Sequence, residues 1–79
     1  MENKAEPTAA ELLTEAQDLL DRGIQRVGRM SLARAQGEAL KTSTMRTLAV
    51  RDMLAASAKM KWAAAQTERA ALAFLRENS

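Results

Sequence analysis

The stretch of sequence that determines the fold is residues 45–74, MRTLAVRDMLAASAKMKWAAAQTERAALAF. Small and apolar residues recur along it at steps of four and three, which is the spacing of a coiled-coil seam. Alanine in such a seam lets two helix backbones approach closely, and methionine fills irregular gaps. The stripe could also serve as a peptide-binding groove, but an unpaired helix of this length is not stable alone, which favours a core. The predicted seam consists of Met45, Ala49, Met53, Ala56, Met60, Ala63, Thr67, Ala70 and Phe74.

The helix predicted from this seam extends beyond it in both directions. Between Leu32 and Glu77 the chain has no proline and one glycine, Gly37, so we expect a helix over about residues 31–77. Its weakest point is residues 42–44, Thr-Ser-Thr, where three poor helix formers follow one another. A break there, giving three helices, is the alternative to one long helix.

A first helix is predicted over about residues 8–28. Thr8 and Glu11 match the capping-box pattern at its start. The residues before it, 1–7, are polar and predicted to be disordered, so residues 8–79 form a single helical domain. The apolar residues of the first helix cover an arc of about 140° on a helical wheel, as one buried face requires. They are Ala9, Leu12, Leu13, Ala16, Leu19, Leu20, Ile24, Val27 and Met30.

The predicted turn lies between Gly28, which can close the first helix, and Ser31, which can open the second. So short a connection forces the two helices into an antiparallel hairpin. With the turn near residue 30, the first helix reaches only to about Met53 and leaves roughly 35 Å of the seam uncovered. An exposed apolar strip of that length marks an interface. We therefore expect an all-α hairpin that forms a dimeric helical bundle through Met53, Ala56, Met60, Ala63, Ala70 and Phe74.

The composition also favours self-association. Of the 37 hydrophobic residues among 79, 17 are alanine, which leaves few side chains large enough to fill a core. A single core in so short a chain supplies no more than about 3–5 kcal/mol of net stability. Many small domains gain further stability from disulfides or a structural metal, but this chain has neither cysteine nor histidine. Association with further copies of the chain is the remaining way to stabilise the fold.

The same absences argue against an enzyme. General acid–base catalysis near neutral pH most often uses histidine, and covalent catalysis needs an activated nucleophile beside a base. Ser57 and Lys61 are one helical turn apart, but Lys61 belongs to a pair of solvated lysines. Gly23 and Gly28 are not followed by the Lys-Ser/Thr of a phosphate-binding loop. We expect no catalytic residues, no cofactor and no metal.

The charges are distributed unevenly along the chain. Residues 1–21 carry a net charge of −5 and residues 22–79 carry +7, which gives the overall charge of +2. Arg22, Arg26 and Arg29 recur at helical spacing and form a basic ridge. Such a ridge could follow the phosphates of a nucleic acid or meet an acidic protein surface. The alternative is internal compensation, in which the acidic residues of the first helix lie beside Lys41 and Arg46 of the second.

Trp62 is the second feature that suggests a binding site. It lies away from the predicted seam, among small residues and on the same side as Arg51 and Arg69. An aromatic residue in that setting resembles an anchor for a partner protein, and it could also stack on a base. The alternative is a second packing contact inside the oligomer.

We therefore expect a regulatory adaptor, chaperone or inhibitor that works as a homo-oligomer and binds and occludes another protein through Trp62, Arg51, Arg69, Arg22, Arg26 and Arg29. The alternative is a nucleic-acid-associated regulator that uses the same arginines. The N-terminus has no apolar core of a secretory signal, and the longest apolar run, residues 70–75, is far too short to span a bilayer. A cytoplasmic location without membrane contact is the expectation.

Overall fold

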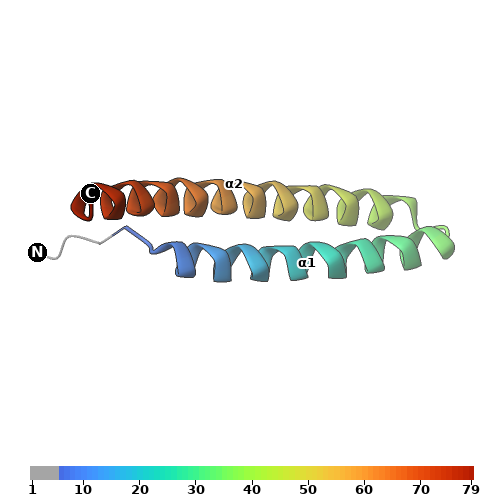
Figure 1. Cartoon of the computed structure of the whole chain (residues 1–79). Helices are drawn as coiled ribbons and strands as arrows, with labels where there is room; N and C mark the ends of the chain where they lie inside the picture. The colour runs from blue at the N-terminus through green and yellow to red at the C-terminus, as the bar shows by residue number, and fades with distance from the viewer. Residues whose placement is uncertain (1–5) are drawn as a thin grey trace, which may run out of the picture.

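The computed structural model describes residues 6–79, which form two α-helices, α1 (Ala9–Ala35) and α2 (Ala39–Glu77). The helices run antiparallel and side by side, so the fold is an all-α hairpin with a longer second helix, as predicted (Figure 1). Most of the predicted disordered N-terminus, residues 1–5, lies outside the described residues. Pro7 is held against α2, because its carbonyl oxygen accepts a hydrogen bond of 2.7 Å from Gln66 Nε2.

The first turn of α1 is stabilised by the predicted capping box. The Thr8 hydroxyl oxygen accepts a hydrogen bond from the Glu11 backbone N–H at 3.1 Å. The Glu11 carboxylate accepts one from the Thr8 backbone N–H at 3.2 Å. Two backbone donors that have no partner inside the helix are therefore satisfied at the N-terminus, and Thr8 sets where α1 begins.

The predicted turn at residues 28–31 is wrong, because α1 continues to Ala35 and passes through Gly28. The chain reverses at Gly37, which has a left-handed φ of +72°. The N–H of Gly37 donates to the carbonyl of Arg34 at 3.1 Å, and the N–H of Glu38 donates to that of Ala33 at 2.9 Å. This pair of bonds is the Schellman motif, which ends helices at glycine.

No break occurs in α2 at residues 42–44, where the helix is continuous. The threonine hydroxyls there bond to the backbone of the preceding turn. Thr42 donates to the carbonyl of Glu38 at 2.8 Å, and Thr44 donates to that of Leu40 at 3.0 Å. These bonds satisfy the hydroxyl groups without competing for the backbone N–H groups of the helix. The weak helix formers are thereby accommodated in one long helix.

The two helices pack through a seam of small residues. The buried apolar residues are almost all alanines, and Leu12 is the one large side chain among the described residues that is fully buried. The helices approach so closely at Gly23 that a Cβ atom added there would lie 3.6 Å from the backbone oxygen of Ala49 and 3.3 Å from Met53 Cγ. The predicted role of alanine in close helix packing is therefore confirmed. The buried residues are Leu12, Ala16, Gly23 and Ala33 in α1, and Thr42, Ala49, Asp52, Ala56 and Ala63 in α2.

The later turn changes how much of α2 is covered. The longer α1 reaches back to about Gln66, so α2 is uncovered only over residues 67–77, roughly 16 Å of helix rather than 35 Å. The expectation that Ala56 and Ala63 lack cover within the chain is wrong, since they are 0% and 2% exposed. Met53 and Met60 lie at the edge of the seam and are each 38% exposed.

The remaining two residues of the predicted interface lie in the uncovered segment. Ala70 and Phe74 are both exposed, beyond the start of α1. No helix of the described residues is long and apolar enough to cross a membrane.

Two glycine substitutions test the position of the turn. Gly28→Ala should raise the free energy of unfolding by about 0.5–1 kcal/mol, because Gly28 is helical and an added Cβ meets nothing within 4 Å. Gly37→Ala should lower it by about 1 kcal/mol, because of the left-handed φ. Urea denaturation measures both changes. Stabilisation by Gly37→Ala together with destabilisation by Gly28→Ala would place the turn at residue 28 instead.

Candidate functional site

The hairpin is a single layer of two helices, and the seam decides which side chains lie on each of its broad faces. One face carries the residues that directly follow Leu12 and Leu19 in α1 and Asp52 and Lys59 in α2. These positions share a face because the two helices are right-handed and antiparallel. The opposite face carries the residues that directly precede the seam alanines. Trp62, which precedes Ala63, and Ala55, which precedes Ala56, are examples.

Trp62 lies on this opposite face and is 42% exposed, so the hairpin covers only part of its ring. Arg69 follows it two helical turns along α2, about 10 Å away. Arg51 lies on the same side at the outer edge of the face, three turns before Trp62 and about 16 Å away. We call this surface the Trp62 face; it comprises Glu15, Arg22 and Arg29 of α1 and Leu48, Arg51, Ala55, Trp62 and Arg69 of α2.

The predicted arginine ridge is divided by the packing of the hairpin. Arg22 and Arg29 are exposed on the Trp62 face, whereas Arg26 turns into the seam and pairs with Asp52. The distance from Arg26 Nη1 to Asp52 Oδ2 is 3.1 Å, and the two side chains are 29% and 12% exposed. Asp52 Oδ2 is buried and accepts no hydrogen bond of acceptable geometry, so the contact is an ion pair alone. Arg26 therefore contacts α2 within the seam and is not part of the open surface.

Acidic side chains are interspersed with the arginines on the Trp62 face. Lys59 Nζ lies 3.3 Å from Glu15 Oε2, which links α2 to α1. Glu15, Asp18, Arg22 and Lys59 line one shallow hollow with Leu19. The expected pairing of the α1 acids with Lys41 and Arg46 is not found among the described residues, where Lys41 pairs with Glu38 instead. The shifted turn is the reason, because it changes which residues of the two helices lie at the same level.

The seam also contains polar residues, which the alternation of alanine and methionine does not predict. Asp52, Lys59 and Gln66 each contact α1 or the residues just before it, through Arg26, Glu15 and Pro7 respectively. Their seven-residue spacing, which continues back to Met45, is the signal that could have identified them.

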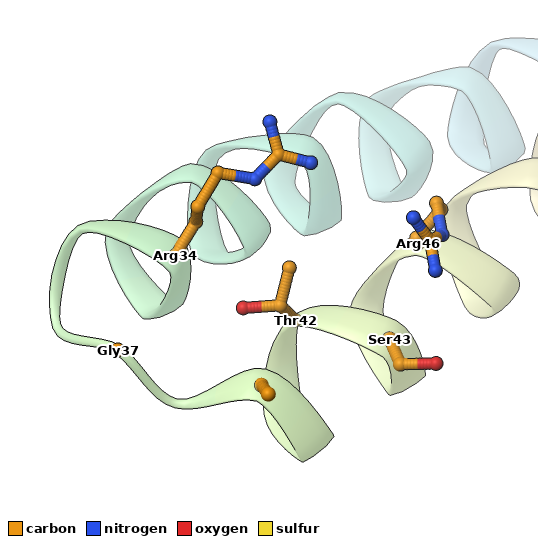
Figure 2. Close-up of a pocket in the computed structure, with 6 residues that line it drawn as sticks. Arg34, Gly37, Thr42, Ser43 and Arg46 are labelled. Atoms are coloured by element: carbon orange, nitrogen blue, oxygen red, sulfur yellow. The ribbon is translucent and has the colours of Figure 1, made fainter.

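A second hollow lies at the turn, with a volume of about 350 Å³. Figure 2 shows Arg34 on α1 and Arg46 on α2 on either side of Thr42, with Gly37 at the bend of the chain. The Thr42 hydroxyl is already used in its bond to Glu38. The hollow therefore offers two cationic side chains at an open surface and no enclosed pocket for a substrate.

No group of three or more histidine, cysteine, aspartate or glutamate side chains in residues 6–79 could hold a metal ion. Comparison of the chain with protein-family models, curated proteins and solved structures found no match. The chemistry of the two faces is therefore the feature of the hairpin that bears on its function.

We expect the loss of Arg26 and the loss of Asp52 to change the stability of the hairpin by different amounts. Arg26→Met should lower the free energy of unfolding by about 1–3 kcal/mol, because it leaves the buried Asp52 carboxylate without a partner. Asp52→Ala should change it by less than about 0.5 kcal/mol, because alanine suits the seam and Arg26 can reach solvent. The double variant should recover most of the stability that Arg26→Met loses. Urea denaturation of the three variants checks this, and a larger loss for Asp52→Ala than for Arg26→Met would contradict it.

Proposed function

We propose that this chain is a non-enzymatic helical binding protein, an adaptor, chaperone or inhibitor that associates with further copies of itself and occludes a surface of a partner protein. The observation that carries the proposal is the exposure of large apolar side chains. Thirteen of them are exposed among the described residues, while the buried apolar core consists of five alanines and one leucine. A surface with more large apolar groups than the interior is suited to contacts with other macromolecules.

The Trp62 face is the proposed site for the partner protein. A half-exposed tryptophan among smaller side chains has the character of an interface anchor, since tryptophan and arginine dominate the binding energy of protein interfaces. Arg22, Arg29, Arg51 and Arg69 lie on the same face as Trp62 and form no ion pair within 4.0 Å with any carboxylate of the described residues. Their charge suits a partner whose docking surface is acidic.

The alternative function is a nucleic-acid-associated regulator that uses the same arginines. The loss of Arg26 to the seam and the presence of Glu15 and Asp18 beside Arg22 weigh against it, because a phosphate backbone would lie against carboxylates. A protein surface can place its own basic groups opposite these acids, which favours the protein partner.

Trp62→Ala tests the site. We expect it to weaken partner binding by about 30-fold or more, the effect of removing a hot-spot residue, without changing helicity or assembly mass. Leu54→Ala is the matched control, because Leu54 is an exposed apolar residue on the outer side of α2. Binding is measured by titration with the partner recovered on the tagged chain. Loss of helicity or of assembly in Trp62→Ala would instead assign Trp62 to internal packing.

Nuclease treatment and salt separate the two functions. Recovery of the same protein with and without nuclease supports the protein-binding function, and recovery of nucleic acid without a stable protein partner contradicts it. Four arginine–phosphate contacts would weaken binding roughly a hundredfold between about 50 and 200 mM salt. A helix-face interface anchored on Trp62 should weaken by less than about tenfold over that range.

A further inference from the structure

The face opposite Trp62 carries no charged side chain over its central part. Leu13, Leu20 and Val27 follow seam residues of α1, and Met53 and Met60 follow seam residues of α2, so all five lie on one side of the hairpin. Ile24 and Val50 extend the same surface outward. We call this surface the apolar face; it comprises Leu13, Leu20, Ile24, Val27, Val50, Met53 and Met60.

The larger apolar side chains of α2 lie to one side of its contact with α1. Ala49, Ala56 and Ala63 face α1, but the seam positions between them are held by Asp52 and Lys59. Met53 and Met60 directly follow these two polar residues, so their larger side chains lie beside the seam, on the apolar face. A helix that carries apolar residues beside its contact with one neighbour as well as within it typically touches a second neighbour. The pattern indicates a second neighbour for α2 on this side.

The shape of the hairpin also indicates that it lacks a second layer to cover its apolar face. Its Cα trace is only 13 Å across in its thinnest dimension, which is one layer of helices. Stable domains consist of at least two packed layers around a core. A compact monomer of this mass should expose about 4,700 Å². The whole chain exposes 6275 Å², which is about 1,600 Å² more. This surface includes that of residues 1–5, and a standard interface buries about 800 Å² on each partner, so half of the excess is sufficient to supply one.

We propose that a second copy of this chain covers the apolar face and that the two hairpins form a four-helix bundle of two layers. This inference rests on the self-association included in the proposed function and names the surface that performs it. The core of the bundle then contains the residues of the apolar face, which the single hairpin leaves without a covering layer. The Trp62 faces lie on the two outer surfaces of the bundle, where they remain accessible to a partner.

A second copy suits this face better than an unrelated partner. The seam alone buries one large side chain, so the hairpin needs its cover in order to fold, and another copy of the chain is always present when the chain is made. The face is also suited to self-packing, because Met53 and Met60 alternate along α2 with the small residues Ser57 and Ala64.

A pair of matched variants tests the proposal. Ile24 lies on the apolar face and is 64% exposed in the hairpin, and Leu54 lies on the outer side of α2 and is 67% exposed. In an isolated hairpin, Ile24→Glu and Leu54→Glu would have equal effects. In the bundle, Ile24→Glu places two carboxylates in the interface, and the dimer dissociation constant should rise by about a hundredfold or more. Leu54→Glu should leave it unchanged within about threefold.

Sedimentation equilibrium of the full chain at micromolar concentration gives the masses, and circular dichroism gives the helicity. The expected result is twice the chain mass of 8.6 kDa for the natural chain and for Leu54→Glu, with loss of dimer and helicity in Ile24→Glu. A folded monomer of the natural chain would overturn the proposal, as would equal effects of the two variants or folding that requires a different protein. Failure of the partner-binding tests alone, with dimers intact, would overturn the proposed function and leave this inference standing.

Discussion

The close approach of the two helices at Gly23 and Ala49 is the constraint on which the rest of the structure depends. A glycine and a row of alanines let the backbones come near enough for continuous contact, but such residues remove little apolar surface from water. The seam therefore sets the geometry of the hairpin without supplying much of its stability. The large apolar side chains are placed at the edge of the seam or outside it, so the same feature that brings α1 and α2 together leaves Leu13, Met53 and Met60 open to further contacts.

Polar residues in the seam select the register of the two helices. Alanine layers alone would fit almost as well after a slip of one heptad, because every seventh position of α2 from Ala49 to Ala70 is alanine. The pairs Arg26–Asp52 and Glu15–Lys59 and the bond from Gln66 to Pro7 can form together in one register only. The heptad positions of the residues, which a slip of seven residues does not change, place charged side chains on the Trp62 face and leave the other face apolar. The two faces thereby acquire different chemistry, which is what a protein needs if it is to assemble through one surface and bind through another.

The sequence was sufficient to predict two helices, their antiparallel arrangement, Thr8 as the N-cap residue of α1 and an unbroken α2. The turn was misplaced because Gly28 and Ser31 carry capping signals as good as those of Gly37, and local chemistry does not distinguish them. The seam distinguishes the two turn positions. Its steps of three and four continue through Arg26 and Met30 to Ala33, so α1 has to extend beyond Gly28. The predicted seam of α2 was displaced for a related reason: Met53 and Met60 look like core residues, whereas Asp52 and Lys59, which contact α1, do not. Of the predicted binding residues, Arg26 has a seam position by its spacing, but its charge is accommodated there only because Asp52 lies opposite it.

We propose that the hairpin is stable only when a second copy covers its apolar face. The most direct test is thermal unfolding, followed by far-UV circular dichroism, over a hundredfold range of protein concentration. Folding that is coupled to association gives a midpoint temperature that rises with total protein concentration, because dilution favours the separated chains. We predict such a rise, with a helical signal that is lost on dilution at constant temperature. A midpoint that is the same at every concentration, in a chain that sediments as a helical monomer, would show that the hairpin is stable without a second copy.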